Sequence, residues 1–291
     1  MKQNAIKVGF IGAGTTGTAL AVRLAQTDYA VIAVYSRSIT SAKSLAERIP
    51  ECTVYQTAQE VSDKTQLVFL TTPDDVIAKV ASEIRWHENQ SVVHCSGAHS
   101  VDILEPAIKQ GASTGCLHPL QTFAGIEQAI NNIPGSTFAI EAQEPLLSTL
   151  KQIAIILEGQ YVELKASGKV LYHAAAVFAC NYLVTLVKLA TDLWQTFDVP
   201  QSKATKALLP LLRGTLNNIE NIGLPDCLTG PIARGDLGTI GKHLSALEKV
   251  NQHLLNMYKI LGLQTIPIAL AKGKIDMNKA SELEKLFKIS N

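Results

Sequence analysis

Several features that would assign a protein to a class are scarce in this sequence. Its 26 lysines and arginines are balanced by 25 acidic residues, a net charge of +1, so no overall field attracts nucleic acid or an anionic membrane. Five cysteines are scattered without CxxC spacing, which argues against a disulfide framework or a zinc site. The start, Met1 to Asn4, lacks the apolar core of a signal peptide. We therefore expect a cytoplasmic protein that binds a small molecule, with no nucleic-acid or membrane partner.

Long uncharged apolar runs are also scarce. The most hydrophobic stretch, residues 170–193, still carries His173, Asn181, Lys188 and Asp192. Because polar and charged groups interrupt it, we predict a buried helix and not a membrane span. The chain has 291 residues, enough for two domains that each bury a core.

The most informative pattern lies near the amino terminus. An apolar run over residues 6–11 meets glycines with GxGxxG spacing, and a helix-like stretch over residues 18–25 follows at once. In this context the spacing is the dinucleotide-binding fingerprint: Gly12 allows a tight turn, Gly14 lets backbone approach a pyrophosphate, and Gly17 lets the helix pack on the strand. Free N–H groups at the helix start suit phosphate. The predicted phosphate-binding residues are Gly12, Ala13, Gly14, Thr15, Thr16 and Gly17.

The end of the second expected strand, residues 30–35, favours NADP over NAD. It carries Ser36, Arg37 and Ser38, where an NAD-specific fold would place an acid against the ribose hydroxyls. Arginine can pair with a 2′-phosphate and stack on adenine, and serines can donate hydrogen bonds to it. An ordinary solvated arginine in a polar turn is the alternative.

Later segments complete an α/β fold. Apolar runs over residues 66–70, 91–95 and 114–117 are expected to be parallel strands of a doubly wound Rossmann sheet, whose ligands lie at the carboxyl ends of the strands. We predict a nucleotide-binding domain over residues 1–164, closed by a strand–helix–strand unit, and an all-α domain over residues 165–291 with helix breaks near 199–200, 223–235 and 262–267. The further cofactor-binding residues expected at strand ends are Thr71, Thr72, Pro73, Ser96 and Gly97.

Five polar residues are candidates for catalysis. His118 is expected just after a strand, held extended by the following proline, where it could donate a proton or polarise a carbonyl; it could equally only hydrogen-bond a loop. Lys169, His173 and Asn181 fall on one polar stripe of a helix. Arg234, in a Gly-Pro loop, could clamp a carboxylate or phosphate, or form a structural salt bridge. The histidines lack compact metal-ligand spacing, so no metal is expected.

The residues also support a resemblance over essentially the whole chain. It is carried by the glycine fingerprint with the segments Thr71–Asp75, Leu117–Leu120, Tyr172–Leu183 and Thr229–Asp236. The chain resembles Rossmann-like oxidoreductases that have a helical carboxyl domain like that of 6-phosphogluconate dehydrogenase, in the group with the domain of unknown function 2520. The resemblance implies an NADP-linked oxidoreductase that dimerises through its helical domains, related to pyrroline-5-carboxylate reductase and to deazaflavin-dependent NADP reductases.

One departure keeps the function open. In the wider superfamily a lysine and an asparagine one helical turn apart carry catalysis, whereas here Lys169 and His173 have that spacing and the asparagine is Asn181. The first hypothesis is an oxidoreductase that transfers hydride to or from a C=O or C=N bond of a small, polar, acidic metabolite between the domains. In that reading His118 or His173 transfers the proton, Asn181 orients the substrate and Arg234 holds its acidic group. The alternatives are an NADP(H)-binding sensor without catalysis and, more remotely, a zinc-dependent hydrolase.

Overall fold

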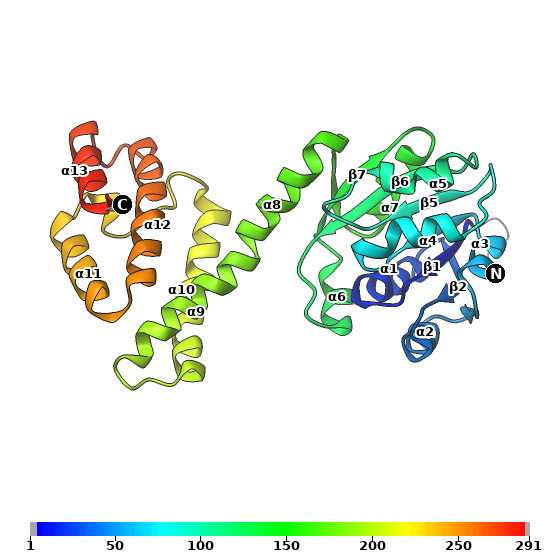
Figure 1. The fold of residues 1–291 in the computed structure, drawn as a ribbon, viewed down its shortest axis with the longest axis horizontal. Coiled ribbons are helices and arrows are strands. Elements are labelled where there is room, and N and C mark those ends of the chain that lie inside the picture. The colour runs from blue at the N-terminus through cyan, green and yellow to red at the C-terminus, as the bar shows by residue number, and fades with distance from the viewer. Residues whose placement is uncertain (1–4, 289–291) are drawn as a thin grey trace. The chain divides into compact units, whose positions relative to one another are not determined.

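A computed structural model describes residues 5–288, so the start of the chain at Met1 to Asn4 lies outside the described residues. The chain forms two compact units that divide between Tyr182 and Leu183, and each is described by itself (Figure 1). This division places the helix over residues 169–179, which the sequence assigns to the second domain, in the same unit as the sheet. A domain boundary at residues 164 and 165 stays a prediction.

The first unit is built on one eight-stranded sheet, in the order β3-β2-β1-β4-β5-β6-β7-β8. The strands are β1 Lys7–Ile11, β2 Ala30–Tyr35, β3 Thr53–Val54, β4 Leu67–Leu70, β5 Ser91–His94, β6 Ser113–Leu120, β7 Thr137–Ala142 and β8 Gln160–Glu163. The first six strands run parallel to one another, β7 pairs antiparallel with β6, and β8 pairs parallel with β7. The doubly wound parallel sheet is therefore confirmed, with an added unit that joins it in the opposite direction.

Helices cover both faces of this sheet and create two separate apolar cores. They are α1 Thr15–Ala25, α2 Ile39–Ala46, α3 Ala58–Lys64, α4 Ile77–Glu83, α5 Glu105–Ile108, α6 Ile126–Asn132 and α7 Leu146–Ile156. The same unit includes α8 Lys169–Ala179, whose Leu171 and Phe178 side chains are exposed. Successive residues of a strand point to opposite faces, so Phe10 stacks on Phe69 in one core while Ile11 and Leu70 belong to the other. A sheet buried on both faces explains the continuous apolar strands of the sequence.

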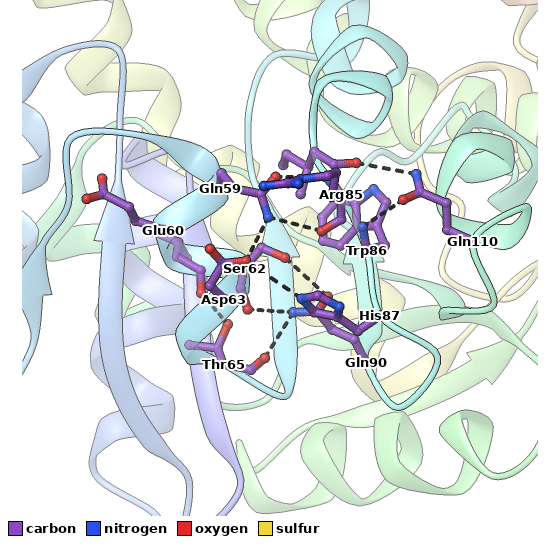
Figure 2. Close-up of polar contacts among 12 residues, drawn as sticks. Gln59, Glu60, Ser62, Asp63, Thr65, Arg85, Trp86, His87, Gln90 and Gln110 are labelled. Atoms are coloured by element: carbon purple, nitrogen blue, oxygen red, sulfur yellow. Dashed lines mark hydrogen bonds and ion pairs between the residues drawn. The ribbon is translucent and has the colours of Figure 1, made fainter.

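A polar network fastens α3 to the turn between α4 and β5 (Figure 2). The side chain of Gln59 exchanges hydrogen bonds with the backbone of Arg85, accepting at 2.8 Å and donating at 3.1 Å. The buried amide of Gln90 donates to the carbonyls of Ser62 and Thr65 at 2.7 and 2.9 Å. These bonds satisfy polar groups that would otherwise be costly to bury. They hold α3, and Gln59 with it, in a fixed position beside the sheet.

The second unit consists of helices only within the described residues, as the sequence predicts. Its helices are α9 Asn181–Gln195, which begins at the division, α10 Gln201–Ile222, α11 Leu237–Val250, α12 Gln252–Ala271 and α13 Met277–Phe287. Breaks before α10 and between α10 and α11 are confirmed. The break expected at residues 262–267 is wrong, because α12 continues through Gly262 and Pro267. A Cβ at Gly262 would lie 2.6 Å from the Phe287 ring, so this glycine serves close helix packing and not a turn.

The prediction of a buried helix over residues 170–193 is wrong for the single chain. The segment is divided at Cys180 into α8 and α9, and Leu171, Phe178 and Val184 are 76, 71 and 69% exposed. By length and composition alone, the stretches 166–195 and 252–271 could each cross a membrane, which is weak evidence. Periodicity shows that a helix has an apolar face, but it does not show what covers that face.

Candidate functional site

A cavity of about 530 Å³ in the first unit brings the predicted cofactor-binding segments together. Its predicted members are Gly12, Ala13, Gly14, Ser36, Arg37, Ser38, Thr71, Thr72 and Pro73. They come from the ends of β1, β2 and β4, three neighbouring parallel strands. Thr15, Thr16 and Gly17 form the first turn of α1. The cavity therefore occupies the place where doubly wound sheets bind their ligands.

The glycine turn has the geometry that each glycine was expected to provide. Gly12 has a φ of +110°, which side chains of L residues rarely allow, and its carbonyl accepts a 2.7 Å hydrogen bond from Thr71 Oγ1. A Cβ at Gly17 would lie 2.7 Å from the Gly12 carbonyl oxygen, so α1 packs directly on the turn. A Cβ at Gly14 would meet nothing within 4 Å. Gly14 is the N-cap of α1 and thus leaves open space at the helix amino terminus for a ligand.

Two features of the cavity suit a phosphorylated nucleotide. Arg37 is exposed at the cavity wall between Ser36 and Ser38, and the chain has no acidic residue at this strand end. The hydroxyl oxygen of Thr72 is buried and has no hydrogen-bond partner among the described residues, which is unusual for a buried polar atom. The residues of the cavity that sequence reasoning missed are Ile11, Tyr35, Thr57, Ala58, Gln59, Val76, Lys79, Val80, Glu83 and Ile84.

A second cluster in the same unit surrounds His118. This residue lies within β6 and not after a strand, because pairing with β7 extends β6 to Leu120. Its Nδ1 lies 2.8 Å from the hydroxyl of Tyr172, and its ring centroid lies 6.4 Å from that of His173. Gly97 faces both rings, since a Cβ there would lie 2.8 Å from His118 Nε2 and from His173 Cδ2. The structure thus brings together His118, His173 and Gly97, which the sequence singles out separately.

The surroundings of His118 keep its imidazole neutral. Burial lowers its pKa most, the Lys169 ammonium and His173 lower it further, and Asp74 opposes them, with a result of about 4. Burial also raises the pKa of the Tyr172 hydroxyl above its ordinary value. At neutral pH both partners of the Tyr172–His118 hydrogen bond are therefore uncharged.

Lys169 lies on α8 with Tyr172 and His173 and is 1% exposed. Its Nζ donates to the Ser96 carbonyl at 3.3 Å and to Cys116 Sγ at 2.8 Å. Ser96 Oγ in turn donates to the Asp74 carboxylate at 2.6 Å, so Ser96 contacts this cluster, and its role in cofactor binding stays a prediction. The Lys169 side chain is thus enclosed by Ser96 and Cys116, and its catalytic role stays a prediction.

Two predicted catalytic residues lie apart in the chain from this cluster. Asn181 is the first residue of α9, and Arg234 ends a short 3₁₀ helix in the second unit, before Asp236, which caps α11. Their roles stay predictions. Sequence reasoning missed Tyr172, although its spacing from Lys169 and His173 places the three on one helix face. Within residues 5–288, no group of three or more His, Cys, Asp or Glu side chains is arranged to hold a metal ion.

Comparison with protein families gives two matches. Residues 1–119 match a family described as a Rossmann-like domain, and residues 136–265 match one described as a domain of unknown function, DUF2520. A comparison with curated proteins finds no match.

Among solved structures, a Bacteroides fragilis protein assigned as an NADP oxidoreductase is similar to this chain. The two are 26% identical with a TM-score of 0.73, over 90% of this chain and 98% of that one. A protein from Thermotoga maritima is also 26% identical with a TM-score of 0.73, over 91% and 99% of the two chains. A pyrroline-5-carboxylate reductase from Streptococcus pyogenes, 17% identical with a TM-score of 0.64 over 97% and 100%, shares the fold.

Proposed function

The chain combines a Rossmann-like domain with a DUF2520 domain, and from this premise we propose that it is an NADP-dependent oxidoreductase. The observation that carries the proposal is the 530 Å³ cavity that joins the glycine turn to Arg37. The 26% identity to a protein assigned as an NADP oxidoreductase supports it. The substrate is a small, polar, acidic metabolite with a C=O or C=N bond.

The cavity residues fit NADP at both of its charged ends. The open space at Gly14 and the helix start behind it would receive the pyrophosphate. Arg37, with Ser36 and Ser38, would hold the 2′-phosphate, since a guanidinium pairs with phosphate and no carboxylate at that strand end repels it. NAD, which lacks this phosphate, is expected to bind more weakly. When bound, the nicotinamide supplies or accepts a hydride.

The His118 cluster and two residues further along the chain are proposed to act on the substrate. His118 or His173 donates the proton or polarises the substrate bond, and Lys169 contributes a buried positive charge. Asn181 orients the substrate, and Arg234 binds its acidic group in bidentate fashion. Undiminished turnover of an identified substrate by a variant carrying both His118→Ala and His173→Ala would contradict this assignment.

Calorimetric titration with NADPH and then NADH tests the cofactor assignment. The wild type is expected to bind NADPH more tightly, and Arg37→Ala is expected to weaken NADPH binding about 10- to 100-fold, toward the NADH value. Arg85→Ala is the matched control, because Arg85 is exposed and its hydrogen bonds to Gln59 use backbone atoms. If neither nucleotide binds the wild type, the glycine turn does not serve a dinucleotide.

We also propose that the protein is a cytoplasmic homodimer. Large apolar side chains are exposed on three successive helices of the single chain, an arrangement typical of a surface that another subunit covers. They are Val170, Leu171, Phe178, Tyr182, Val184, Leu186, Leu209, Leu211, Leu216, Ile219 and Ile222. Light scattering during size-exclusion chromatography is expected to give twice the chain mass of 31.3 kDa. A mass of one chain would contradict the proposal.

One observation favours the second candidate, an NADP(H)-binding sensor without catalysis. Lys169 is enclosed by Ser96 and Cys116, so it is not placed like a lysine that contacts a substrate. Hydride transfer from NADPH to any metabolite above the background rate would rule the sensor out. NADPH binding without turnover of a broad panel would favour it.

A further inference from the structure

The segment that follows β4 connects the nucleotide cavity to the His118 cluster. At its start Thr71 is fixed to the glycine turn, because its hydroxyl donates a hydrogen bond to the Gly12 carbonyl at 2.7 Å. From Thr71 as far as Pro73 the segment lines the cavity. Pro73, whose ring restricts φ, leads directly into Asp74. The position of Asp74 is therefore tied to that of the cavity wall.

The carboxylate of Asp74 bonds to the neighbouring loop and not to its own helix. Within residues 5–288, the short 3₁₀ helix Asp74–Val76 has no side-chain cap. The carboxylate instead accepts a hydrogen bond from Ser96 Oγ at 2.6 Å, a length typical of a hydroxyl bound to a charged oxygen. Asp74 follows β4 and Ser96 follows β5, which are neighbouring parallel strands. The bond therefore joins two loops at the carboxyl ends of the strands.

Ser96 passes this connection on to the turn that it begins. The residue is 4% exposed, and the hydroxyl oxygen that donates to Asp74 also accepts from the backbone N–H groups of Ala98 and His99, each at 3.2 Å. The Ser96 carbonyl accepts from Lys169 Nζ at 3.3 Å. Displacing a buried residue with this many hydrogen bonds is costly. Asp74 therefore fixes the whole turn and not one side chain.

Gly97, within this turn, lies against both imidazoles of the His118 cluster. A Cβ at Gly97 would be 2.8 Å from His118 Nε2 and 2.8 Å from His173 Cδ2, so there is no room for one. The centroids of the two rings are 6.4 Å apart, and the glycine backbone packs against each of them. Because closely packed groups transmit displacement, a shift of the turn would move at least one imidazole.

Resting on the proposed function, we propose that Asp74 is a positioning residue for catalysis. Its carboxylate acts through the turn at Ser96 and Gly97. That turn fixes the imidazoles of His118 and His173 relative to the wall of the nucleotide cavity. Hydride and proton must reach the same substrate bond, and a misplacement of about 1 Å can lower the rate on the order of 100-fold. Removing one carboxylate is therefore expected to free the turn and slow the reaction.

Two other roles of Asp74 lead to different expectations. If Asp74 acted only through its charge, no neutral side chain could replace it. Asp74→Asn tests this, because the amide oxygen can still accept the hydrogen bond from Ser96 Oγ while the charge is lost. If Asp74 bound the cofactor, its loss would weaken NADPH binding. Of the described residues 71–74, the first three line the cavity and Asp74 does not, so NADPH affinity tests this second role.

Nitrogen-15 NMR of the histidine-labelled full chain, alone and with NADP⁺, tests the positioning without a substrate. The ring signals are assigned with His118→Gln and His173→Gln. Asp74→Ala is expected to shift or broaden the signals of both histidines, and Asp74→Asn is expected to return them to their wild-type positions. Asp75→Ala is the matched control, because Asp75 is an exposed carboxylate of the same short helix. Unchanged signals in Asp74→Ala, or equal displacement in Asp74→Asn, would overturn the proposal.

A double variant tests whether Asp74 acts through Ser96. Ser96→Ala removes the donor to Asp74 and the acceptor for two backbone N–H groups, so it is expected to shift the same histidine signals further. Adding Asp74→Ala should then cause no additional shift, since both changes break one connection. An additional shift as large as that of Asp74→Ala alone would overturn the proposal. Should Ser96→Ala not fold, the variants of the exposed Asp74 decide by themselves.

Calorimetry and turnover separate this proposal from the proposed function. Asp74→Ala is expected to bind NADPH within about threefold of the wild type, and binding weakened about tenfold or more would assign Asp74 to the cofactor and overturn its positioning role.

On a substrate that the wild type reduces, Asp74→Ala should lower kcat about 10- to 100-fold with little change in KM. Asp74→Asn should restore most of kcat, and Asp75→Ala should leave it unchanged. An unchanged kcat in Asp74→Ala would overturn the proposal and leave the oxidoreductase intact. If the wild type binds neither nucleotide, the proposed function fails, while the NMR comparison still decides whether Asp74 positions the histidines.

Discussion

The chain contains the same histidine–tyrosine pair twice, in two different surroundings. In the first unit Tyr172 lies 2.8 Å from His118 Nδ1, and in the second Tyr258 lies 2.9 Å from His243 Nδ1; both pairs meet edge to face. His118 is half-buried, whereas His243 is exposed on α11. The local geometry is thus shared, and the two pairs differ in how far they are buried. The comparison teaches that the surroundings of the pair, and not the pair, make a functional site.

The largest expected difference between the pairs is in turnover. On an identified substrate, His118→Ala is expected to lower kcat roughly 100-fold or more, because it removes the group that polarises the reacting bond. His243→Ala, the equivalent change in the other pair, should leave kcat unchanged. Steady-state NADPH oxidation measures both. Equal losses in the two variants would mean that neither pair is part of the site.

The second largest expected difference between the pairs is in how the free energy of unfolding depends on pH. The pKa of His118 in the folded chain is about 4, below the ordinary 6.5, so the unfolded chain binds the proton first as the pH falls. Protonation of His118 in the unfolded chain therefore lowers the free energy of unfolding. This loss is absent above pH 6.5, grows as the pH falls to 4, and then levels off at about 3 kcal/mol. Urea titrations from pH 7 to 4 would show a shallower loss for His118→Gln. The His243→Gln curve measures what an exposed histidine contributes.

A smaller difference in the free energy of unfolding is expected when a glycine near each histidine is replaced by alanine. Gly97→Ala would force a Cβ against His118 and His173, and overpacking of this kind costs about 1–3 kcal/mol. Gly241→Ala, two residues before His243 within α11, meets nothing within 4 Å and should stabilise the chain by roughly 0.5–1 kcal/mol, because alanine favours helix. Thermal unfolding measures both changes. A stabilised Gly97→Ala would show that the rings move apart easily.

The smallest expected effect is the titration of His118 itself. Lys169→Met removes the neighbouring charge and keeps the side-chain length, so the pKa of His118 should rise by about one pH unit. Lys188→Met is the control, since Lys188 is exposed and pairs with Asp192 at 2.6 Å. NMR titration of labelled histidine measures the pKa of His118 in both variants. An unchanged pKa of His118 in Lys169→Met would assign the lowered pKa to burial and His173.

The nucleotide cavity could be predicted largely from the sequence because its main signals are local. Gly12, Gly14 and Gly17 act within one strand–turn–helix segment, and their expected roles agree with the φ, the open space and the close packing found there. The cavity wall contributed by α3 and α4 could not be predicted, because Gln59 and Lys79 reach it only through the packing of those helices on the sheet.

The histidine cluster was only partly predictable. His118 and His173 were each singled out, but their contact joins β6 to α8 across more than fifty residues. The antiparallel pairing of β6 with β7 placed His118 inside a strand. Tyr172 was missed because a tyrosine on an apolar helix has no distinctive pattern until its partner is known.

By itself the sequence determined the fold class, the glycine turn, the serine–arginine strand end and the resemblance to the two families that match parts of the chain, because these depend on neighbouring residues or on the order of elements along the chain. The tertiary structure alone decided that Lys169 is enclosed with Ser96 and Cys116, that Tyr172 holds His118, and that the apolar faces of α8 and α9 are exposed. The physical reason is that burial and electrostatic potential are sums over groups distant in sequence. A charge or an apolar face acquires its role only when folding shows what surrounds it.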